Sequence, residues 1–362
     1  NNSENVIQTI LENGVKEEVA EPDGTKKIIV IVNENPIVMN GKKGYVFTDI
    51  FDYIDFDLSK MQGAGIVTLV NGTNAQYTQP LYNGDKIEVY WKEKELRMRM
   101  CSIASGSSGN CIYVGTEATH LLVDVGISCK KTLEGLNQLG LTGKDIDGIL
   151  ITHEHSDHVG GLGILSRQFG IPIYATAGTI EAIKKNRSLG QIDSSLFCEI
   201  AADEKKILKD ITVNPMRISH DAAQPVAYRF QYGSRRMAVV TDLGTYDAYT
   251  VESLKGMDVL MLEANHDINM LQVGPYPYYL KQRILGKKGH LSNELSGKLL
   301  GSLLHDHFKT VFLGHLSKEN NLAELAYETV RLEIAMADNP YKPEDFPILV
   351  ANRSELSQLV EI

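Results

Sequence analysis

The stretch 152–158, with the sequence Thr-His-Glu-His-Ser-Asp-His, constrains this 362-residue chain more than any other part of it. It follows an apolar run, 146–151, which predicts a short buried strand. Side chains along an extended stretch alternate between two faces, so His153 and His155 should point one way, while Asp157 and His158, after the turn, can point another. The spacing therefore predicts that one loop can serve two metal ions.

The residue types in this stretch indicate which metals it suits. Neutral imidazole and carboxylate groups bind zinc, and they also bind manganese and iron. A closed structural zinc site is disfavoured, because no pair of cysteines lies nearby. A solvated polar loop is the alternative, and it suits a single histidine better than three imidazoles and a carboxylate within six positions.

His153, His155, Asp157 and His158 match the HxHxDH signature of the metallo-β-lactamase-fold hydrolases, and the chain resembles that family from Met98 to its last residue. The resemblance implies an αββα sandwich, a fold of the α+β or α/β class. It also implies two divalent metal ions, either zinc or manganese, with iron as a further choice. The implied ligands are His153, His155 and His220 for one ion, Asp157, His158 and His315 for the other, and Asp242 as the bridge between them.

Two residues are expected to support the ligands without binding metal themselves. By the same resemblance, Asp124, at the end of the apolar run 121–123, is the buried aspartate whose carboxylate holds the metal loop in shape. His266 is ambiguous between a neighbour of the ligands and a supporting residue, and we expect the supporting role.

Three further segments, 102–110, 219–223 and 315–321, together resemble the YycJ group of this family, also called WalJ or VicX. That resemblance implies an exonuclease that digests double-stranded DNA from the 5′ end, with RNA as an alternative substrate. Two ions roughly 3.5–4 Å apart can bind a water between them and lower its pKa, so the expected nucleophile is a bridging hydroxide. Asp157, with one oxygen free of its metal, is expected to orient that water or accept its proton.

Glu263 and His290 lie between the last two expected ligands in the sequence. They resemble the Glu and His that the RNase Z branch of the superfamily places beside its metals, where the pair assists the departing oxygen. We therefore predict a catalytic role for both, since a phosphodiester needs that help more than a β-lactam or a thioester does. The alternatives are a helix cap for Glu263 and a surface turn for His290.

Two segments are predicted to contact the substrate. The stretch 276–283 interleaves basic and aromatic residues, which could hold a strand by phosphate contacts and stacking. A solvated helix face over a buried aromatic residue is the alternative. The loop 105–110 could meet an anionic oxygen with its backbone amides, or it could be only a tight glycine turn. The predicted substrate-binding residues are Ser107, Asn110, Lys281, Arg283, Lys287 and Lys288.

The first part of the chain is expected to fold separately from the 98–362 metallohydrolase domain. Residues 26–94 alternate short strands with one helix, whose cap we expect at Thr48 and Asp49. The order β-β-α-β-β resembles a ubiquitin-like β-grasp domain, which would bind an unidentified protein partner or act as a tether; a passive appended fold is the alternative. Residues 1–25 lack periodicity and are predicted to be a mobile lead-in.

The net charge and the hydropathy of the chain bear on its partners and its location. A net charge of -10 gives no global attraction to nucleic acid, but a local patch and bound metals can still supply positive charge. No apolar run approaches the roughly 20 residues that span a bilayer, and no signal peptide opens the chain. We expect a cytoplasmic protein without membrane insertion. Because the first residue is Asn1 and not methionine, we also expect a longer parent sequence.

Two other functions remain open at this point. A small-molecule hydrolase of the lactamase, glyoxalase or thioesterase type shares every expected ligand, and only Glu263, His290 and the basic-aromatic stretch distinguish a nuclease from it. An interaction protein with a non-catalytic metal fold is the other alternative. The complete ligand set argues against that alternative, because a relic usually loses at least one ligand.

Overall fold

A computed structural model describes residues 19–20, 24–59, 63–92 and 96–362. The chain divides into two compact units, Asn1–Glu95 and Leu96–Ile362. The second unit thus begins two residues before the start that the sequence suggested. The predicted lead-in lies almost wholly outside the described residues. The charged stretch 92–95, which the sequence suggests as the joint between the units, lies mostly outside them too. No helix in the described ranges combines the length and the apolar character that crossing a membrane requires.

The first unit is built on a sheet in which β3, β2, β8 and β5 are neighbours, with β2 and β8 parallel and the outer pairs antiparallel. Its core gathers alternate residues of these strands, which is the period expected of a sheet with one buried face. This order is compatible with the β-grasp expectation, which stays a prediction. The strands are β1 (Val19–Ala20), β2 (Lys26–Val32), β3 (Asn35–Lys42), β4 (Tyr45–Val46), β5 (Gly65–Val70), β6 (Thr73–Asn74), β7 (Pro80–Leu81) and β8 (Lys86–Lys92).

The helix expected in this unit is a 3-10 helix, η1 (Phe47–Asp52), and not an α-helix capped by Thr48 and Asp49. The Asp49 carboxylate accepts a hydrogen bond from Val46 N (2.8 Å), so the turn begins earlier than predicted. Tyr53 N then donates to Ile50 O, three residues back, which closes the tighter turn.

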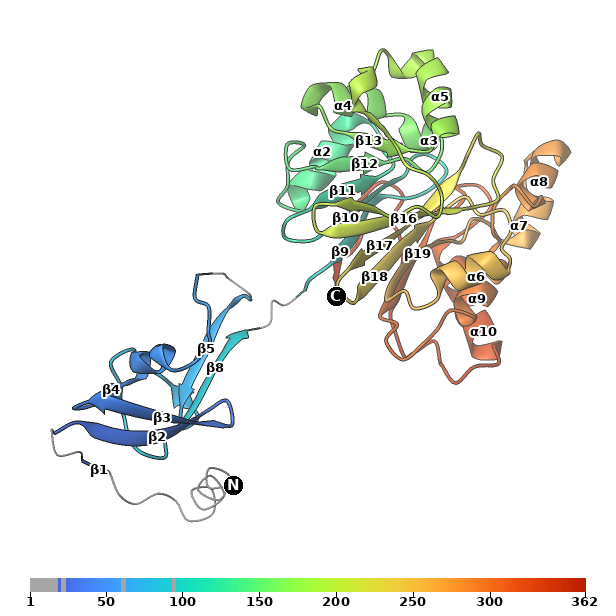
Figure 1. The fold of residues 1–362 in the computed structure, drawn as a ribbon. Helices are drawn as coiled ribbons and strands as arrows, with labels where there is room; N and C mark the ends of the chain where they lie inside the picture. Colours follow the sequence, from blue (N-terminus) through green and yellow to red (C-terminus); the bar gives the residue numbers. More distant parts are fainter. Residues whose placement is uncertain (1–18, 21–23, 60–62, 93–95) are drawn as a thin grey trace. The chain divides into compact units, whose positions relative to one another are not determined.

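The second unit contains two seven-stranded sheets (Figure 1). The first has the order β14-β13-β12-β11-β10-β9-β22 and the second the order β15-β16-β17-β18-β19-β20-β21. The strands of the first are β9 (Arg99–Ala104), β10 (Cys111–Gly115), β11 (His120–Val123), β12 (Gly148–Leu150), β13 (Ile173–Ala175), β14 (Phe197–Glu199) and β22 (Val360–Glu361). Those of the second are β15 (Lys206–Leu208), β16 (Ile211–Arg217), β17 (Val226–Tyr232), β18 (Arg235–Val240), β19 (Val259–Glu263), β20 (Thr310–Gly314) and β21 (Ile348–Val350).

Helices cover the outer face of each sheet, as Figure 1 shows. A central core joins inward residues of both sheets, such as Val123 of β11 and Val239 of β18. Separate cores lie beneath the helices on either side. These four layers confirm the predicted αββα sandwich. The helices are α2 (Cys129–Gln138), α3 (Ser156–Val159), α4 (Leu162–Phe169), α5 (Ala177–Lys185), α6 (Ala248–Leu254), α7 (Ile268–Val273), α8 (Tyr278–Leu285), α9 (Asn293–Gly301) and α10 (Ala323–Met336), with short 3-10 turns η2 (Arg187–Leu189) and η3 (Ser194–Leu196).

Each sheet changes from antiparallel to parallel pairing partway across, at β11 in the first and at β18 in the second. The parallel strands β11, β12, β18, β19 and β20 therefore each end beside another parallel strand. Ligands of α/β proteins commonly bind at such carboxyl ends. Every metal ligand that the sequence predicted, except His220, lies in the segment that follows the carboxyl end of one of these strands.

Candidate metal centre

Three residues of the site leave their strands in the left-handed backbone conformation. Asp124 follows β11 with a φ of 60°, Asp242 follows β18 with a φ of 58°, and His315 follows β20 with a φ of 53°. Residues other than glycine rarely adopt this conformation, and when they do, it often marks a functional site. The three strand ends thus turn abruptly where their side chains enter the same site.

One buried carboxylate holds the loop after β12. Asp124 accepts hydrogen bonds from Thr152 N (2.8 Å), Thr152 Oγ1 (2.8 Å) and His158 Nδ1 (2.7 Å). Burial raises the pKa of Asp124, although the nearby His158 opposes that shift. Asp124 therefore lies where the family resemblance puts the loop-holding aspartate. Asp157 and His158 lie on the short helix α3, which the sequence pattern did not reveal.

Gly126 lies where the metal loop passes over the loop 105–110. A Cβ atom at Gly126 would come within 1.7 Å of Asp157 O and 2.7 Å of Asn110 N. The backbones are joined here, since Asn110 N donates to Asp157 O (2.8 Å) and Gly126 N donates to Asn110 O (2.7 Å). Sequence reasoning missed Gly126, whose only signal was its position two residues after a predicted strand end.

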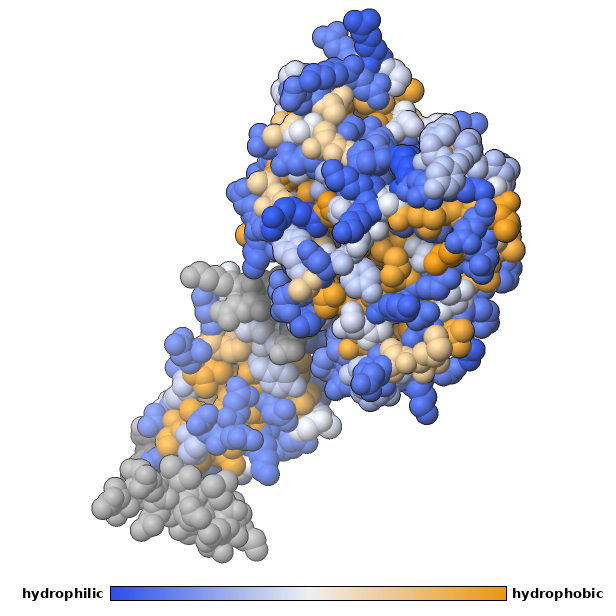
Figure 2. Space-filling view, turned by 90° about the vertical axis from the view of Figure 1, so that its right-hand side faces the viewer, coloured by the Kyte–Doolittle hydropathy of each residue, from blue (hydrophilic) through white to orange (hydrophobic). Residues whose placement is uncertain are grey.

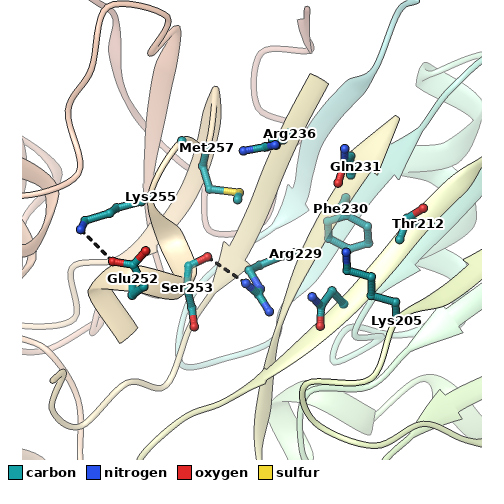
Figure 3. A pocket seen from close by; sticks show the side chains of 12 residues that line it. Lys205, Thr212, Arg229, Phe230, Gln231, Arg236, Glu252, Ser253, Lys255 and Met257 are labelled. Atoms are coloured by element: carbon teal, nitrogen blue, oxygen red, sulfur yellow. Dashed lines mark hydrogen bonds and ion pairs between the residues drawn. The ribbon is translucent and has the colours of Figure 1, made fainter. Parts of the chain in front are cut away.

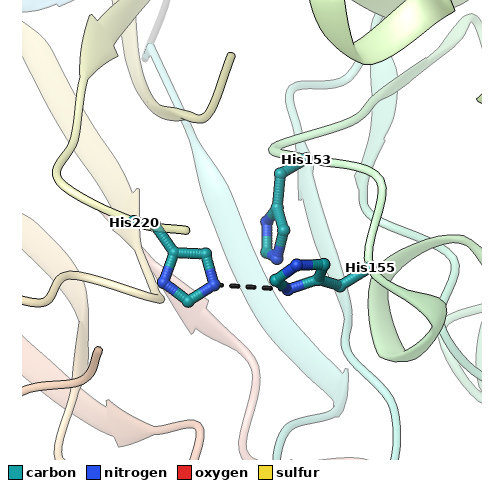
Figure 4. A group of neighbouring side chains, drawn as sticks. All are labelled: His153, His155 and His220. Carbon is teal, nitrogen blue, oxygen red and sulfur yellow. Dashed lines mark hydrogen bonds between the residues drawn. The ribbon is translucent and has the colours of Figure 1, made fainter. Parts of the chain in front are cut away.

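Three imidazole rings converge from two loops (Figure 4). His220 Nε2 lies 3.3 Å from His155 Nδ1, and the centroid of the His153 ring lies 4.6 Å from that of His155 and 4.8 Å from that of His220. His153 Nε2 is buried and has no hydrogen-bond partner among the described residues. Ring nitrogens so close together repel one another unless a proton or a cation lies between them, so this arrangement suits a metal ion.

A second group of donors lies beside the first. Asp157 Oδ2 is 3.5 Å from His158 Nε2 and 3.4 Å from His315 Nε2. Asp242 reaches both groups, because its Oδ2 lies 3.2 Å from His158 Nε2 and its Oδ1 lies 3.7 Å from His220 Nε2. Burial would raise the pKa of Asp242, but His315 and His158 outweigh it and hold that pKa well below the usual range.

Hydrogen bonds to Nδ1 fix which ring nitrogen faces the site. His158 donates from Nδ1 to Asp124, His220 Nδ1 lies 3.1 Å from Gly289 O, and His315 Nδ1 lies 2.7 Å from Glu263 Oε1. Each Nε2 is then left with its lone pair toward the other donors. Partners of this kind orient metal-binding histidines and make them better ligands.

Glu263, the last residue of β19, is fully buried, so its side chain contacts the other residues of the site and not the solvent, and its predicted catalytic role stays a prediction. The helix cap considered as its alternative is wrong. Burial would raise the pKa of Glu263, but His290 and His315 lower it to about 2, so the carboxylate is ionised. Its oxygens accept hydrogen bonds from Asp242 N (3.2 Å), Leu243 N (3.0 Å), Leu291 N (2.9 Å), His290 Nδ1 (2.9 Å) and His315 Nδ1 (2.7 Å).

His290 has the same geometry as the expected ligands. Its Nδ1 is held by Glu263, its ring centroid lies 5.3 Å from that of His315, and 14% of its side chain is exposed. This exposure leaves Nε2 as the ring nitrogen that can meet a bound substrate. His290 is therefore part of the site and not a surface turn residue.

The donor atoms fit two divalent cations. In each of the groups below, one ligand atom per residue lies within 4.8 Å of all the others. The buried His153 Nε2 and Asp242 Oδ2, neither of which forms a hydrogen bond within the described ranges, are atoms that a cation would satisfy. The groups are His153, His155 and His220; Asp157, His158 and His315; His153, His158 and Asp242; and Asp242, Glu263, His290 and His315.

Burial is informative for three further residues that the sequence predicted. Asn110 is fully buried, with Oδ1 accepting from Gly106 N (2.9 Å) and Nδ2 donating to Asp157 O (3.3 Å), so it supports the metal loop and does not bind substrate. Ser107 is exposed, and its substrate contact stays a prediction. Burial lowers the pKa of His266 to about 4, and neither of its ring nitrogens has a hydrogen-bond partner in the described structure.

The basic-aromatic stretch forms α8, next to the metal centre. Arg283 forms a two-pronged ion pair with Asp221 (2.5 and 2.9 Å), and Asp221 lies 3.4 Å from His220 Nε2. Tyr278 and Tyr279 are 77% and 75% exposed, so the alternative of a buried aromatic beneath a solvated face is wrong for both. Figure 2 views the side on which α6, α7 and α8 lie in Figure 1, and hydrophobic residues are interspersed with hydrophilic ones there.

The other predicted cations have different surroundings. Lys281 Nζ donates to Gln272 O (2.7 Å), which ties α8 to the end of α7. Lys287 and Lys288 are exposed, and Lys287 O accepts a hydrogen bond from Ser219 Oγ (2.8 Å), next to His220. Sequence reasoning missed the Arg283–Asp221 pair, because the two residues are 62 positions apart.

Comparisons with known proteins agree with this geometry. Residues 104–283 match the sequence profile of the metallo-beta-lactamase superfamily. The chain is 40% identical over 244 residues to the exodeoxyribonuclease WalJ of Streptococcus pneumoniae, which covers 67% of this chain and 91% of WalJ. It is also 40% identical over 228 residues to the exodeoxyribonuclease YycJ of Bacillus anthracis, covering 63% of this chain and 86% of YycJ.

Solved structures share the fold at low sequence identity. The metallo-beta-lactamase fold protein YhfI from Bacillus subtilis has a TM-score of 0.56 and 18% identity, covering 74% of this chain and all of YhfI. Zn(2+)-bound PqqB from Methylobacterium extorquens has a TM-score of 0.54 and 15% identity, covering 72% of this chain and 99% of PqqB. At these identities the likeness supports the fold alone.

Proposed function

This chain belongs to the family of the exodeoxyribonucleases WalJ and YycJ, within the metallo-β-lactamase superfamily, and from that membership we propose that it is a metal-dependent DNA exonuclease that digests duplexes from the 5′ end. One observation carries the proposal beyond family membership. His290, a proton donor suited to a phosphodiester, stands beside both donor groups and is held by an ionised carboxylate. RNA is an alternative substrate of the same chemistry.

Zinc or manganese fits the mixed imidazole and carboxylate donors, with iron as a further choice. His153, His155 and His220 would hold one ion, and Asp157, His158 and His315 the other, with Asp242 reaching both. When bound, two such ions activate a water as the nucleophile and neutralise charge on the scissile phosphate.

Asp157 is suited to orienting the attacking water. About a quarter of its side chain is exposed, whereas Asp242 is almost fully buried. Burial would raise the pKa of Asp157, but His158 and His315 hold that pKa well below its usual range, so the carboxylate stays ionised. An ionised carboxylate accepts hydrogen bonds, and it can therefore align a water for in-line attack.

His290 is suited to protonating the departing oxygen. Because Nδ1 is committed to Glu263 (2.9 Å), the proton that is transferred would be held at Nε2, for which no hydrogen bond is recorded among the described residues. Glu263 holds the ring in this orientation, as a buried carboxylate does for a general acid-base histidine. Glu263 acts here through His290 and is a positioning residue.

The α8 segment is the proposed DNA-binding surface. Exposed aromatic rings stack on bases, and Lys281, Lys287 and Lys288 can approach phosphates. Arg283 is already neutralised by Asp221, so we expect it to anchor α8 to the metal centre more than to bind DNA. For the N-terminal unit, a tether or a site for a protein partner remains our proposal, and so does a cytoplasmic location.

A substrate comparison tests the proposal. Purified protein reconstituted with manganese or with zinc would be given 5′-end-labelled duplex DNA and, in parallel, a thioester and a β-lactam. We expect mononucleotides from the labelled end and no turnover of the other two substrates. The His155→Ala variant should lose metal and activity together, whereas Lys130→Ala, whose exposed side chain on α2 belongs to none of the donor groups, should keep both. Hydrolysis of the thioester or the lactam with intact DNA would favour the small-molecule hydrolase instead.

A further inference from the structure

A depression of about 560 Å³ lies on the second sheet beside the end of α6 (Figure 3), and its lining includes none of the residues of the metal centre. Its floor is formed by side chains on one face of three adjacent strands, because Asn214 of β16 pairs with Arg229 of β17, and Gln231 of β17 pairs with Arg236 of β18. We call it the α6 groove, and its lining includes Lys205, Asn214, Arg229, Arg236, Glu252 and Lys255.

The α6 groove is positively charged on a chain that is negative overall. Lys205, Arg229, Arg236 and Lys255 line it, and Glu252 is its one carboxylate. Lys255 is paired with Glu252 (2.7 Å). The positive charges of Lys205, Arg229 and Arg236 therefore have no further carboxylate in the lining of the groove. The side chains of Lys205 and Arg236 have no ion-pair partner among the described residues and are exposed. An anion is the ligand that this balance of charge would accept.

Arg229 is the most buried of these cations. It is half-buried, and its Nη1 donates to Ser253 O (3.1 Å). Its Nε is buried and has no hydrogen-bond partner in the described structure, and the same holds for Oδ1 of its cross-strand neighbour Asn214. Guanidinium groups with unused donors bind phosphate through two parallel hydrogen bonds, which matches a phosphate-bearing ligand.

A second depression, of about 580 Å³, lies between α6 and the metal centre, because its lining includes both Tyr249 of α6 and His220. It borders the other end of α6 and is lined by His220, Lys288 and Arg217 among others. Arg217 lies over the ring of Tyr249, 4.7 Å from its centroid, and pairs with Asp203 (3.2 Å). Cationic side chains therefore lie near both ends of α6. The end that carries Arg217 and Lys288 also borders His220 of the metal centre.

The length of β16 gives the distance between the second depression, at Arg217, and the α6 groove, at Thr212. From Arg217 to Thr212 there are five residues, which span roughly 17 Å at about 3.3 Å per residue. Successive phosphates of one DNA strand are about 3.4 Å apart along the duplex axis. The α6 groove therefore lies roughly five nucleotides from the second depression.

We propose that the α6 groove binds the phosphate backbone of the DNA substrate about five nucleotides beyond the second depression, which borders the metal centre at His220. This inference rests on the proposed nuclease function and adds to it a length requirement. It predicts that long duplexes use the groove, whereas very short ones bind through the metal centre alone.

The test compares a duplex of 20 base pairs with a 3-mer, a stem of 3 base pairs closed by a stable hairpin loop, at several salt concentrations. The variants are Arg229→Gln and the double variant Lys205→Gln/Arg236→Gln, with Lys130→Gln on α2 as the matched control. We expect a KM for the 20-mer that is raised several-fold, an unchanged kcat, and unchanged values for the 3-mer. Each phosphate contact that is removed should also lower the slope of log KM against log salt by about 1.

Several outcomes separate the possibilities. If the substitutions change KM equally for both substrate lengths, or if the salt slope is unchanged in both variants, the α6 groove does not bind the DNA backbone. If the variants change only inhibition by a free mononucleotide, the groove binds a small anion and the proposal fails. If Arg229→Gln does not fold, the exposed double variant decides the matter alone. A wild-type protein that leaves all DNA intact would instead refute the nuclease function, whereas anisotropy with labelled duplex would still measure binding to the groove.

Discussion

Asp124 makes three hydrogen bonds within the metal loop, and each requires an accepting oxygen. In Asp124→Asn, one of the two oxygens becomes an NH₂ group that faces donors. We expect metal affinity to fall by roughly 10- to 100-fold and the free energy of unfolding to fall by about 1–3 kcal/mol. Metal content after dialysis and urea unfolding measure the two effects.

Asp147→Asn is the matched control for that substitution. Asp147 also accepts a backbone hydrogen bond, from His120 N (3.0 Å), but it lies before β12 and not after β11. It should keep its metal. An Asp124→Asn protein with full metal content would show that the carboxylate does not organise the loop.

His290 invites a test that depends on the leaving group. In His290→Ala, we expect kcat on DNA to fall by about 10²- to 10⁴-fold, since general acid catalysis contributes on that order. A p-nitrophenyl phosphodiester, whose leaving group needs no proton, should be affected far less. Both metals should remain, as measured by elemental analysis.

The control for His290 is His305→Ala. The His305 ring contacts Met257 O (3.0 Å), and neither residue belongs to the donor groups. Equal losses on both substrates would argue against proton donation by His290. Loss of a metal from His290→Ala would instead make it a ligand, which its membership of a four-residue donor group allows.

Among the elements, α8 is exposed on most of its surface, and Ile284 is its buried residue. We expect Tyr278→Ala/Tyr279→Ala to raise KM for duplex DNA about 5- to 150-fold for each base that is stacked, since such stacking contributes about 1–3 kcal/mol. The p-nitrophenyl substrate should be unaffected. Steady-state kinetics on both substrates measure this.

Tyr77→Ala serves as the control for α8, because Tyr77 is as exposed as these tyrosines but lies in the N-terminal unit. An unchanged KM in the double variant would mean that α8 does not stack on DNA.

The elements also differ in how well the sequence predicted them. The alternation in β16–β18 and the apolar runs before Asp124, Asp242 and His315 identified their strands, because one period dominates each stretch. The sequence pattern did not reveal α3, and it placed the start of η1 too late. Both are too short to show a helical period, and hydrogen bonds to side chains or neighbouring loops decide them.

For the whole molecule, metal removal should lower thermal stability. Binding at 100 times the dissociation constant stabilises a folded protein by about 2.7 kcal/mol per site. For a unit of this size we expect chelation to lower Tm by about 5–10 °C per ion and to abolish activity. Calorimetry with and without chelator measures the shift, and adding metal back should reverse it. An unchanged Tm would mean that the donor groups stay empty in the native protein.

The two units have separate cores, so each should unfold on its own. The core of the first unit and the three cores of the second share no residue. Deleting residues 1–95 should leave kcat on DNA and the main unfolding transition unchanged, as activity assays and calorimetry would show. A deletion variant with much reduced kcat would assign the first unit a part in catalysis.

The sequence by itself determined the ligand types, their spacing and the strands that precede them, since these depend on short stretches of chain. It also predicted the αββα fold through the family signature. Only the tertiary structure decided that Glu263 and Asn110 are buried supports, that Arg283 is paired with Asp221, and that Arg229 lies in a positively charged groove. Burial and pairing depend on residues far apart in the chain, and no local pattern encodes which of them will meet.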